Sequence, residues 1–235
     1  MFTASAELYD LIYSGSRDYA SEAAQIAGLI RRDHPTAQRV LDVACGTGEH
    51  ARLLANQHGF HVDGLDLDAA FMRIAQQKLP NASFYQADMI TFDLSERYDV
   101  ITCLFSSIGY VRTLENVRRT LARFRAHLAD GGIVLLEPWF PPDVLGPGRI
   151  SVKKIESAEV SICRMSHVEI DSRLSRLRFE YLLGRAMGIE RLSEVHELGL
   201  FTVEEMLVCF RQAGLSVDYY PNGPSGRGLY LARTE

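Results

Sequence analysis

A glycine-rich turn near the start of the chain is the first feature that can do chemistry. In the segment LDVACGTGEHARLL, Gly46 and Gly48 flank Thr47 between an apolar run and a helical stretch, and Asp42 precedes this turn. Glycine permits a positive φ and lets the backbone come close to a ligand. By itself the turn is a weak signal, because Gly46, Gly48 and Ala51 also fit the G-x-G-x-x-G/A pattern of dinucleotide-binding proteins.

Three acidic residues help to choose between ligand classes. Asp66 ends the next apolar run, where its carboxylate can accept hydrogen bonds from both hydroxyls of a ribose. Asp88 and Met89 end the third run, where they can hold the edge and the face of an adenine. A pyrophosphate gains nothing from the negative charge of Asp42, so a pocket rimmed by Asp42, Asp66 and Asp88 favours a cationic sulfonium nucleoside. The alternative is that these carboxylates only cap helix N-termini.

The elements that must position these residues alternate between strands and helices. Residues 39–140 contain five strand-like runs, and the helical stretches between them end at glycine or proline. Such alternation implies parallel strands with right-handed crossovers and helices on both faces. An amphipathic helix is predicted over 18–32. After the Pro/Gly-rich connector 140–149, three runs favour antiparallel strands, and a helix follows with Thr202 as N-cap and Glu205 completing a capping box.

Length and composition narrow the class of protein. The chain has 235 residues, of which 47% are hydrophobic and 23% charged, as in an ordinary globular domain. The net charge of -5 gives no reason to expect nucleic acid, and no apolar run is long enough to span a membrane. The four cysteines are far apart without a C-x-x-C pair, so we expect no metal centre and a cytoplasmic protein.

The core of the chain resembles the class I S-adenosylmethionine-dependent methyltransferases. Asp42-x-Ala44-x-Gly46-x-Gly48 is similar to their first motif, with Ala44 where the family usually has glycine, and Asp66 is similar to their ribose-binding acid. Residues 98–100 (YDV) and 129–132 (ADGG) resemble the start of their fourth strand and the turn into their fifth. The resemblance implies an α/β fold with a Rossmann-like, mostly parallel sheet, an antiparallel last strand and, here, a small antiparallel β subdomain.

Segments beyond these motifs resemble the dimethyltransferases of nucleotide-linked 3-amino sugars. They are AELYDLIYSG, DYASEAAQIAGLIR, TCLFSSIGY, LLEPWF, ICRMSH and GPSGRGLYL, in this order. The resemblance implies methylation of an amine on a deoxysugar carried by thymidine diphosphate. One departure is that Tyr110 stands where those enzymes have a histidine near the acceptor amine. We divide the single domain into an N-terminal lid and helix (1–38), a cofactor-binding core (39–140), appended strands (150–200) and a C-terminal helix with closing strands (201–235).

If the acceptor is an amino sugar, the resemblance implies binding roles for residues in the C-terminal turn, the appended strands and the segment after the fourth strand. Arg227 lies between two glycines and can bind a diphosphate in bidentate fashion, although turn arginines are often merely solvated. Arg164 and Ser166 share one strand face, whereas His167 points the opposite way unless a bulge intervenes. We expect Tyr110 to position the amine rather than to act as a strong base, and the alternative is that it only packs.

The remaining assignments complete the predicted site. The cofactor-binding residues are Tyr19, Asp42, Ala44, Gly46, Gly48, Asp66, Leu67, Asp88, Met89 and Leu104. The substrate-binding residues are Tyr13, Arg17, Ser106, Trp139, Arg164, Ser166, His167, Ser225 and Arg227. Three alternatives stay open: methylation of another small-molecule amine, carboxylate or hydroxyl, an NAD-dependent oxidoreductase, and a silent cofactor-binding protein. The expected partners are a small-molecule acceptor and, in a homodimer, a second copy of the chain.

Overall fold

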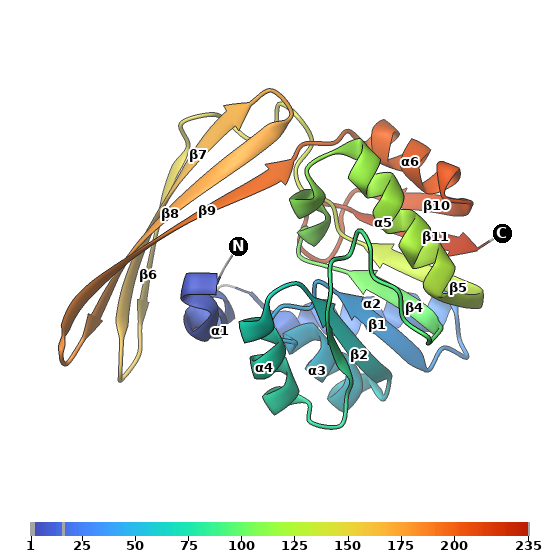
Figure 1. Cartoon of the computed structure of the whole chain (residues 1–235), viewed down its shortest axis with the longest axis horizontal. Helices are drawn as coiled ribbons and strands as arrows, with labels where there is room; N and C mark the ends of the chain where they lie inside the picture. The colour runs from blue at the N-terminus through green and yellow to red at the C-terminus, as the bar shows by residue number, and fades with distance from the viewer. Residues whose placement is uncertain (1–2, 16, 235) are drawn as a thin grey trace.

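A seven-stranded sheet forms the centre of the molecule (Figure 1). The computed structural model describes residues 3–15 and 17–234, so residues 1, 2 and 16 of the predicted lid lie outside the described residues. The strands lie in the order β10-β11-β5-β4-β1-β2-β3. They are β1 (Arg39–Val43), β2 (His61–Asp66), β3 (Phe84–Gln86), β4 (Tyr98–Cys103), β5 (Leu128–Leu136), β10 (Leu215–Tyr220) and β11 (Leu229–Thr234).

The strand directions confirm the predicted class I sheet. Strands β1 to β5 pair in parallel, as the alternation with helices requires. Strand β11 is antiparallel to both β5 and β10, so the last strand of the chain is the reversed one. Because the carboxyl ends of the parallel strands meet at one edge, the segments after β1, β2, β3 and β4 are brought together there.

Helices cover both faces of this sheet. They are α2 (Tyr19–Asp33), α3 (Glu49–His58), α4 (Ala69–Lys78), α5 (Leu114–His127) and α6 (Val203–Gln212). Alternate residues of the strands point to opposite faces. One set packs with Leu121 and Phe124 of α5 and Phe210 of α6, and the other packs with Ile26 of α2 and Leu54 of α3. Helix α6 begins at the predicted capping box of Thr202 and Glu205.

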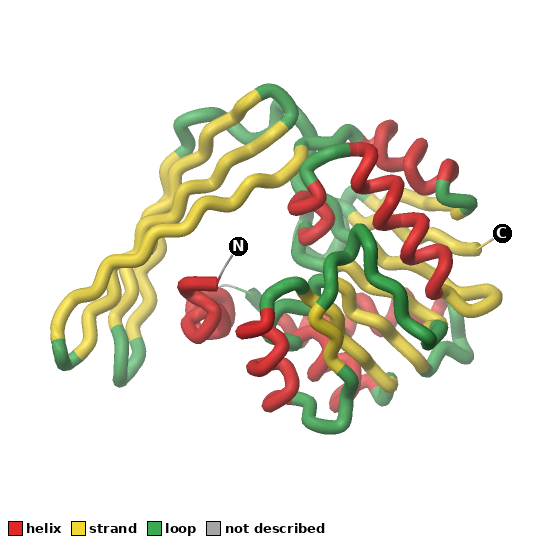
Figure 2. The backbone as a smooth tube through the Cα atoms, viewed as in Figure 1, coloured by secondary structure: helices red, strands yellow, loops and turns green. Residues whose placement is uncertain are grey.

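A second, four-stranded antiparallel sheet extends from the core like an arm (Figures 1 and 2). It consists of β6 (Ile150–Glu156), β7 (Ser161–Asp171), β8 (Leu174–Arg185) and β9 (Gly188–Gly199). Burial alternates along β7, so one face is covered and the other is open to solvent. We call these strands the arm, and its covered face the inner face.

The N-terminal helices lie against the inner face of the arm. They are η1 (Thr3–Leu8) and α1 (Tyr9–Ser14). Leu8 and Ile12 pack with Ile162, Phe179 and Tyr181 of the arm in one buried cluster. The N-terminal segment thereby fills the space between arm and core, where the figures show α1 between the two (Figure 1).

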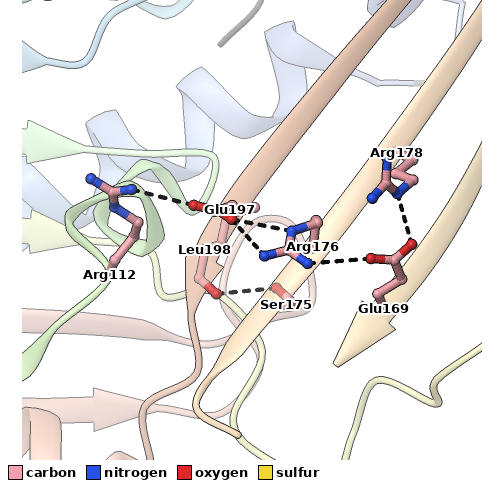
Figure 3. Close-up of polar contacts among 7 residues, drawn as sticks. All are labelled: Arg112, Glu169, Ser175, Arg176, Arg178, Glu197 and Leu198. Carbon is pink, nitrogen blue, oxygen red and sulfur yellow. Dashed lines mark hydrogen bonds and ion pairs between the residues drawn. The ribbon is translucent and has the colours of Figure 1, made fainter. Parts of the chain in front are cut away.

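Ion pairs on the outer face bind the arm strands to each other and to the core (Figure 3). Arg176 of β8 donates to Glu197 of β9 at 3.0 Å and to Glu169 of β7 at 3.4 Å. Glu169 also accepts from Arg178 at 2.7 Å. Glu197 accepts at 3.3 Å from Arg112, which directly follows the short helix η2 (Ser107–Val111) of the core. The arm is therefore attached to the core at the segment that carries Tyr110.

The structure differs from the sequence expectations at three places. Strand β6 was not expected, because its pattern ISVKKIE carries two lysines and it is a largely exposed edge strand. Strand β3 ends at Gln86, so Asp88 and Met89 lie in the loop after it rather than at its end. Residues 129–132, expected as a turn, lie inside β5, where the register against β4 shifts and forms an irregularity.

No helix among residues 3–15 and 17–234 is both long and apolar enough to cross a bilayer.

Candidate active site

A cavity of about 1310 Å³ lies between the carboxyl edge of the central sheet, the N-terminal helices and the inner face of the arm. Its wall contains most of the predicted residues. From the cofactor set these are Ala44, Gly46, Asp66, Leu67, Asp88 and Met89, and from the substrate set Tyr13, Arg17, Trp139, Arg164, Ser166, Ser225 and Arg227. Tyr110, expected to position the amine, also lines the wall. The tertiary structure thus brings together residues from both halves of the chain.

The glycine turn and Asp66 form one end of this cavity. The carboxylate of Asp66 accepts one hydrogen bond on each oxygen, from the backbone N–H of Gly46 at 2.9 Å and from that of Asp68 at 3.0 Å. A carboxylate has about four lone-pair sites, so two remain for further donors. Burial raises the pKa of Asp66, and the two backbone bonds act in the opposite direction. A side chain at Gly46 would meet nothing within 4 Å, so there is room for a ligand above the turn.

The backbone of the turn is left-handed at three positions. Gly46 has φ +57° and Gly48 has φ +75°. A Cβ at Gly48 would lie 2.9 Å from Cβ of Ala75 in α4, so this glycine permits close packing of α4 rather than contact with a ligand. Ala44 has φ 56°, a conformation that costs a residue with a Cβ about 1–2 kcal/mol. The alanine that replaces the usual glycine of the motif is therefore strained.

Asp42 lies behind the turn and not on the cavity wall. Its side chain is 2% exposed and accepts a hydrogen bond from Thr102 Oγ1 at 2.7 Å across the β1–β4 pair. Burial raises the pKa of Asp42 to about 6, with nearby His50 and the Thr102 hydroxyl acting against the rise. The expected rim of three acids consequently consists of Asp66 and Asp88, with Asp42 buried behind them.

Asp88 both lines the cavity and caps the turn that follows. Its Oδ1 accepts from the backbone N–H of Ile90 at 2.8 Å, and its carbonyl oxygen accepts from Thr91 and Phe92. Met89 lies beside it on the cavity wall. The ligand-binding and capping interpretations of Asp88 are thus compatible, because the second carboxylate oxygen is not used by this cap.

Arg227 marks the other end of the cavity. Its guanidinium lies 5.3 Å from the ring centroids of both Trp139 and Phe140 and 5.6 Å from that of Phe105. Its Nη1 donates to Ser106 Oγ at 3.0 Å, and Ser106 in turn donates to the carbonyl of Pro138 at 2.6 Å. Burial lowers the pKa of Arg227. Within the described part of the chain, no carboxylate forms an ion pair with Arg227.

Two further arginines approach the same space. Arg17 lies over the Phe105 ring, with Cζ 3.8 Å from the centroid, and forms an ion pair with Glu22. Arg164 of β7 is 7% exposed and donates to the hydroxyl of Tyr13 at 3.1 Å. The cavity therefore gathers three arginines at its Arg227 end, although the whole chain carries a net charge of -5.

Glu137 orders the loops around Arg227. It is 2% exposed, and its two oxygens accept from the backbone N–H of Phe105 at 2.6 Å and of Ser225 at 3.1 Å. Phe105 and Ser106 both have positive φ, 54° and 63°, a strained pair that Glu137 and Pro138 hold in place. One carboxylate thus joins the end of β4 to the turn that carries Arg227.

Comparisons with known proteins now identify the family. Residues 40–132 match the family model described as "Methyltransferase domain". The chain is 42% identical over 96% of its length, and 89% of the relative's, to a dTDP-3-amino-3,6-dideoxy-alpha-D-glucopyranose N,N-dimethyltransferase of Streptomyces fradiae. It is 36% identical, over 96% of both chains, to a dTDP-3-amino-3,4,6-trideoxy-alpha-D-glucopyranose N,N-dimethyltransferase of Streptomyces venezuelae. The chain belongs to the dTDP-amino-sugar N,N-dimethyltransferases.

Solved structures of this family have the same fold. The crystal structure of Streptomyces venezuelae DesVI matches with a TM-score of 0.92 and 36% identity over 98% of each chain. An amino pentose methyltransferase from Micromonospora echinaspora, solved with S-adenosylmethionine bound, matches with a TM-score of 0.88 and 36% identity over 97% of each chain. The protein is therefore an S-adenosylmethionine-dependent methyltransferase of class I.

The residues at the Gly46 end fit the adenosine part of this methyltransferase's cofactor. The open space above Gly46 would accommodate the nucleoside, and the remaining lone pairs of Asp66 would accept the two ribose hydroxyls. Asp88, through the carboxylate oxygen that its cap does not use, and Met89, through its apolar side chain, would face the base. No group of three or more histidine, cysteine, aspartate or glutamate side chains suited to a metal ion is found in the described ranges.

Six predicted residues lie off the cavity wall. Besides Asp42 and Gly48 they are Tyr19, Leu104, Ser106 and His167. Tyr19 packs edge-on against His50, with ring centroids 5.1 Å apart, and Leu104 is 5% exposed in the core. His167 lies on the outer face of the arm, with Nδ1 3.8 Å from Glu169, because strand alternation turns it away from Arg164 and Ser166. Direct roles for these residues stay predictions.

Sequence interpretation did not select several residues that line or support the cavity. They are Tyr9, Phe105, Glu137, Lys153 and His196. Tyr110, a predicted site residue, has its hydroxyl 2.8 Å from Nδ1 of His196 in β9. A buried acid at the end of a strand was the available signal for Glu137, whereas no local pattern indicates the contact between Tyr110 and His196.

Proposed function

We propose that this chain transfers methyl groups from S-adenosylmethionine to the amine of a dTDP-linked 3-amino deoxysugar. The relatives from the two Streptomyces species act, by name, on such sugars, and the matches cover almost the whole chain. A Saccharopolyspora spinosa relative named for a 4-amino sugar is 37% identical, so the position of the amine is a point for experiment. The observation that carries the proposal is Arg227 at the aromatic end of the cavity, with which no carboxylate of the described residues forms an ion pair.

Arg227 supports a diphosphate-bearing acceptor in particular. A guanidinium suits phosphate because its parallel N–H groups match two phosphate oxygens. Arg227 is held by Ser106 and surrounded by three aromatic rings, which leave it preorganised and available to an anion. Arg164, on the inner face of the arm, adds a second positive charge from the opposite side. The aromatic rings of Trp139 and Phe140 offer faces for the sugar or the base.

The chain's main contribution to the reaction is orientation. Bound S-adenosylmethionine supplies a methyl group already activated by the positive sulfur. Residues at the Gly46 end hold the nucleoside, and those at the Arg227 end hold the diphosphate, so the acceptor nitrogen is directed toward the methyl group between them. Orientation of this kind can remove several kcal/mol from the barrier. The nitrogen must arrive with a free lone pair, because an ammonium ion cannot attack.

The test of this proposal separates the two ligands. Arg227→Ala is expected to weaken binding of dTDP by about tenfold to a hundredfold, since a hydrogen bond to a charged group contributes about 1.5–3 kcal/mol. Binding of S-adenosylmethionine should stay within a factor of two of wild type, that is, about 0.4 kcal/mol or less. Calorimetry with each ligand measures both, and Arg211→Ala on the exposed side of α6 is the matched control. Equal losses for the two ligands would assign Arg227 a structural role and contradict the proposal.

We also propose that the chain forms a homodimer in the cytoplasm. The outer face of the arm exposes apolar side chains in neighbouring strands, with Val152 58%, Met165 49% and Leu182 51% exposed. A second copy of the chain could cover this face through a self-complementary interface. Burial of these apolar side chains would stabilise the dimer. Light scattering of the purified protein at several concentrations distinguishes a dimer from a monomer.

A further inference from the structure

Tyr110 belongs to a buried chain of polar contacts that runs from the cavity into the arm. Its hydroxyl lies 2.8 Å from Nδ1 of His196. Nε2 of the same imidazole lies 3.6 Å from Oε2 of Glu194, and Glu194 accepts a hydrogen bond from the hydroxyl of Tyr181 at 3.2 Å. The side chains of His196 and Glu194 are 0% and 3% exposed. Buried polar groups of this kind are costly unless they are fully paired, so their arrangement calls for an explanation.

The protonation states follow from burial. Burial raises the pKa of the Tyr110 phenol far above its ordinary value, so the phenol keeps its proton. Burial also lowers the pKa of His196, with the Glu194 carboxylate opposing that effect, so the imidazole is neutral at pH 7. A neutral imidazole has one donor and one acceptor nitrogen. The Tyr110 hydroxyl then donates to Nδ1, and the Nε2–H faces the carboxylate of Glu194.

The framework holds these groups in register. Tyr110 is in η2, and Gly109 beside it approaches β9 so closely that a Cβ there would lie 2.9 Å from the Leu198 side chain. After Tyr110 in the chain, Arg112 forms an ion pair with Glu197, which attaches the end of η2 to β9 (Figure 3). Tyr110 and His196 are thus fixed from both sides, although 86 residues separate them in sequence.

We propose that Tyr110, His196 and Glu194 form a proton relay that receives the proton of the acceptor amine. The proposal rests on the proposed function only in requiring an amine acceptor in the cavity. Tyr110 touches the acceptor and is the catalytic residue, whereas His196 and Glu194 act through it as positioning residues. The relay takes the place of a single base at the cavity wall.

The proton balance is complete. The N–H bond of the ammonium breaks and leaves its electron pair on nitrogen, while the proton binds Tyr110 Oη and the original phenol proton passes to His196 Nδ1. The imidazolium that forms keeps its Nε2–H toward Glu194, whose negative charge stabilises it. Each methyl transfer places one new N–C bond on the nitrogen and leaves it positively charged again, so a second methylation needs the same step. After product release, the proton returns through Tyr110 to water in the cavity.

Neighbouring groups determine how easily His196 takes up a proton. The Phe179 ring of β8 packs beside the imidazole, with 5.0 Å between the ring centroids, and the positive charge of Arg164 in β7 lowers the pKa of His196. Glu194 is the carboxylate that opposes Arg164 at this position. Without Glu194, burial and Arg164 would both act against an imidazolium.

The first test is a pH–rate profile. Glu194→Gln and Tyr110→Phe are expected to lower kcat by about 10²-fold at neutral pH, the lower range for loss of a general base. The deficit should disappear at alkaline pH, where the amine is neutral in solution, and KM for the acceptor should change little. Glu169→Gln, the same substitution on the outer face of the arm, is the matched control and should follow the wild-type profile. A deficit that is the same at every pH would overturn the relay.

The second test needs no turnover. ¹⁵N NMR of the ligand-free protein should show His196 neutral with Nδ1 unprotonated, and Tyr110→Phe should shift that Nδ1 resonance because its donor is lost. A charged His196, or a proton on Nδ1, would overturn the relay. Thermal unfolding of each variant shows whether it is folded, and Tyr110→Phe carries the test if Glu194→Gln is not. If no dTDP-amino sugar is methylated but another amine is, the proposed substrate fails while both tests of the relay still apply.

Discussion

Replacing Asp42 by asparagine is expected to stabilise this protein at neutral pH. Asp42 is 2% exposed, and no cation forms an ion pair with it in the part of the chain that the structure describes. Among residues 3–15 and 17–234, the Thr102 hydroxyl is the one donor that forms a hydrogen bond with it. A pKa that rises from 3.8 to about 6 on folding corresponds to about 3 kcal/mol that the ionised form costs the folded state. Asparagine fills the same space, still accepts from Thr102 and carries no charge.

The stability difference between wild type and Asp42→Asn should depend on pH, and urea unfolding can measure it. Because the folded-state pKa of Asp42 is raised, the folded protein binds more protons than the unfolded chain between the two pKa values. The penalty is absent below pH 3.8 and is complete above the folded-state value of about 6. Urea unfolding at a series of pH values should therefore show Asp42→Asn gaining up to about 3 kcal/mol over wild type as the pH rises through this window. Thr102→Val is the companion variant, since loss of the donor should raise the pKa of Asp42 further and extend the pH-dependent loss of stability to higher pH.

The same variant should bind the cofactor more weakly. A buried carboxylate behind the glycine turn attracts a positive sulfonium even without touching it, because charges in a protein interior are poorly screened. Asp42 would then be an acid that costs stability and favours the ligand. A difference in unfolding free energy that is constant with pH, or a wild type that is the more stable protein at pH 7, would refute the reasoning.

Two further predictions concern the cofactor end of the cavity. Asp66→Ala is expected to abolish binding of S-adenosylmethionine in calorimetry, because the acceptor of both ribose hydroxyls is removed; unchanged affinity would refute that placement of the ribose. Ala44→Gly is expected to raise the free energy of unfolding by about 0.5–1 kcal/mol, because relief of the left-handed strain exceeds the extra freedom of glycine in the unfolded chain. Ala51→Gly, buried in α3, is the control and should lose about 1 kcal/mol or more in the same urea titration; a loss at Ala44 would show that its backbone is not strained.

The local chemistry of the chain was predictable because it depends on neighbours in sequence. Hydrophobic periodicity indicated the alternating strands and helices, and the pair Thr202 and Glu205 indicated where α6 begins. The Gly46 turn and Asp66 indicated a nucleoside site, since the carboxyl ends of parallel strands meet at one edge. The charged edge strand β6 escaped prediction because its pattern does not differ from that of a solvated loop.

The tertiary structure decided how deeply each side chain is buried and which side chains far apart in sequence are in contact. Whether an acid such as Asp42 lies on a wall or behind it depends on which strands flank it, here β4 with Thr102. The strain at Ala44 depends on the path of the turn over β2. The contact of Tyr110 with His196 depends on how the arm meets η2, a junction set by Gly109 and by the ion pair of Arg112 with Glu197.

The sequence by itself therefore determined the fold class and the cofactor, because glycine turns, acid spacing and family motifs are local features. The tertiary structure alone decided which side chains share the cavity, which are buried behind it and where a proton can go. Those properties depend on packing between segments that lie far apart along the chain, and no local pattern encodes them.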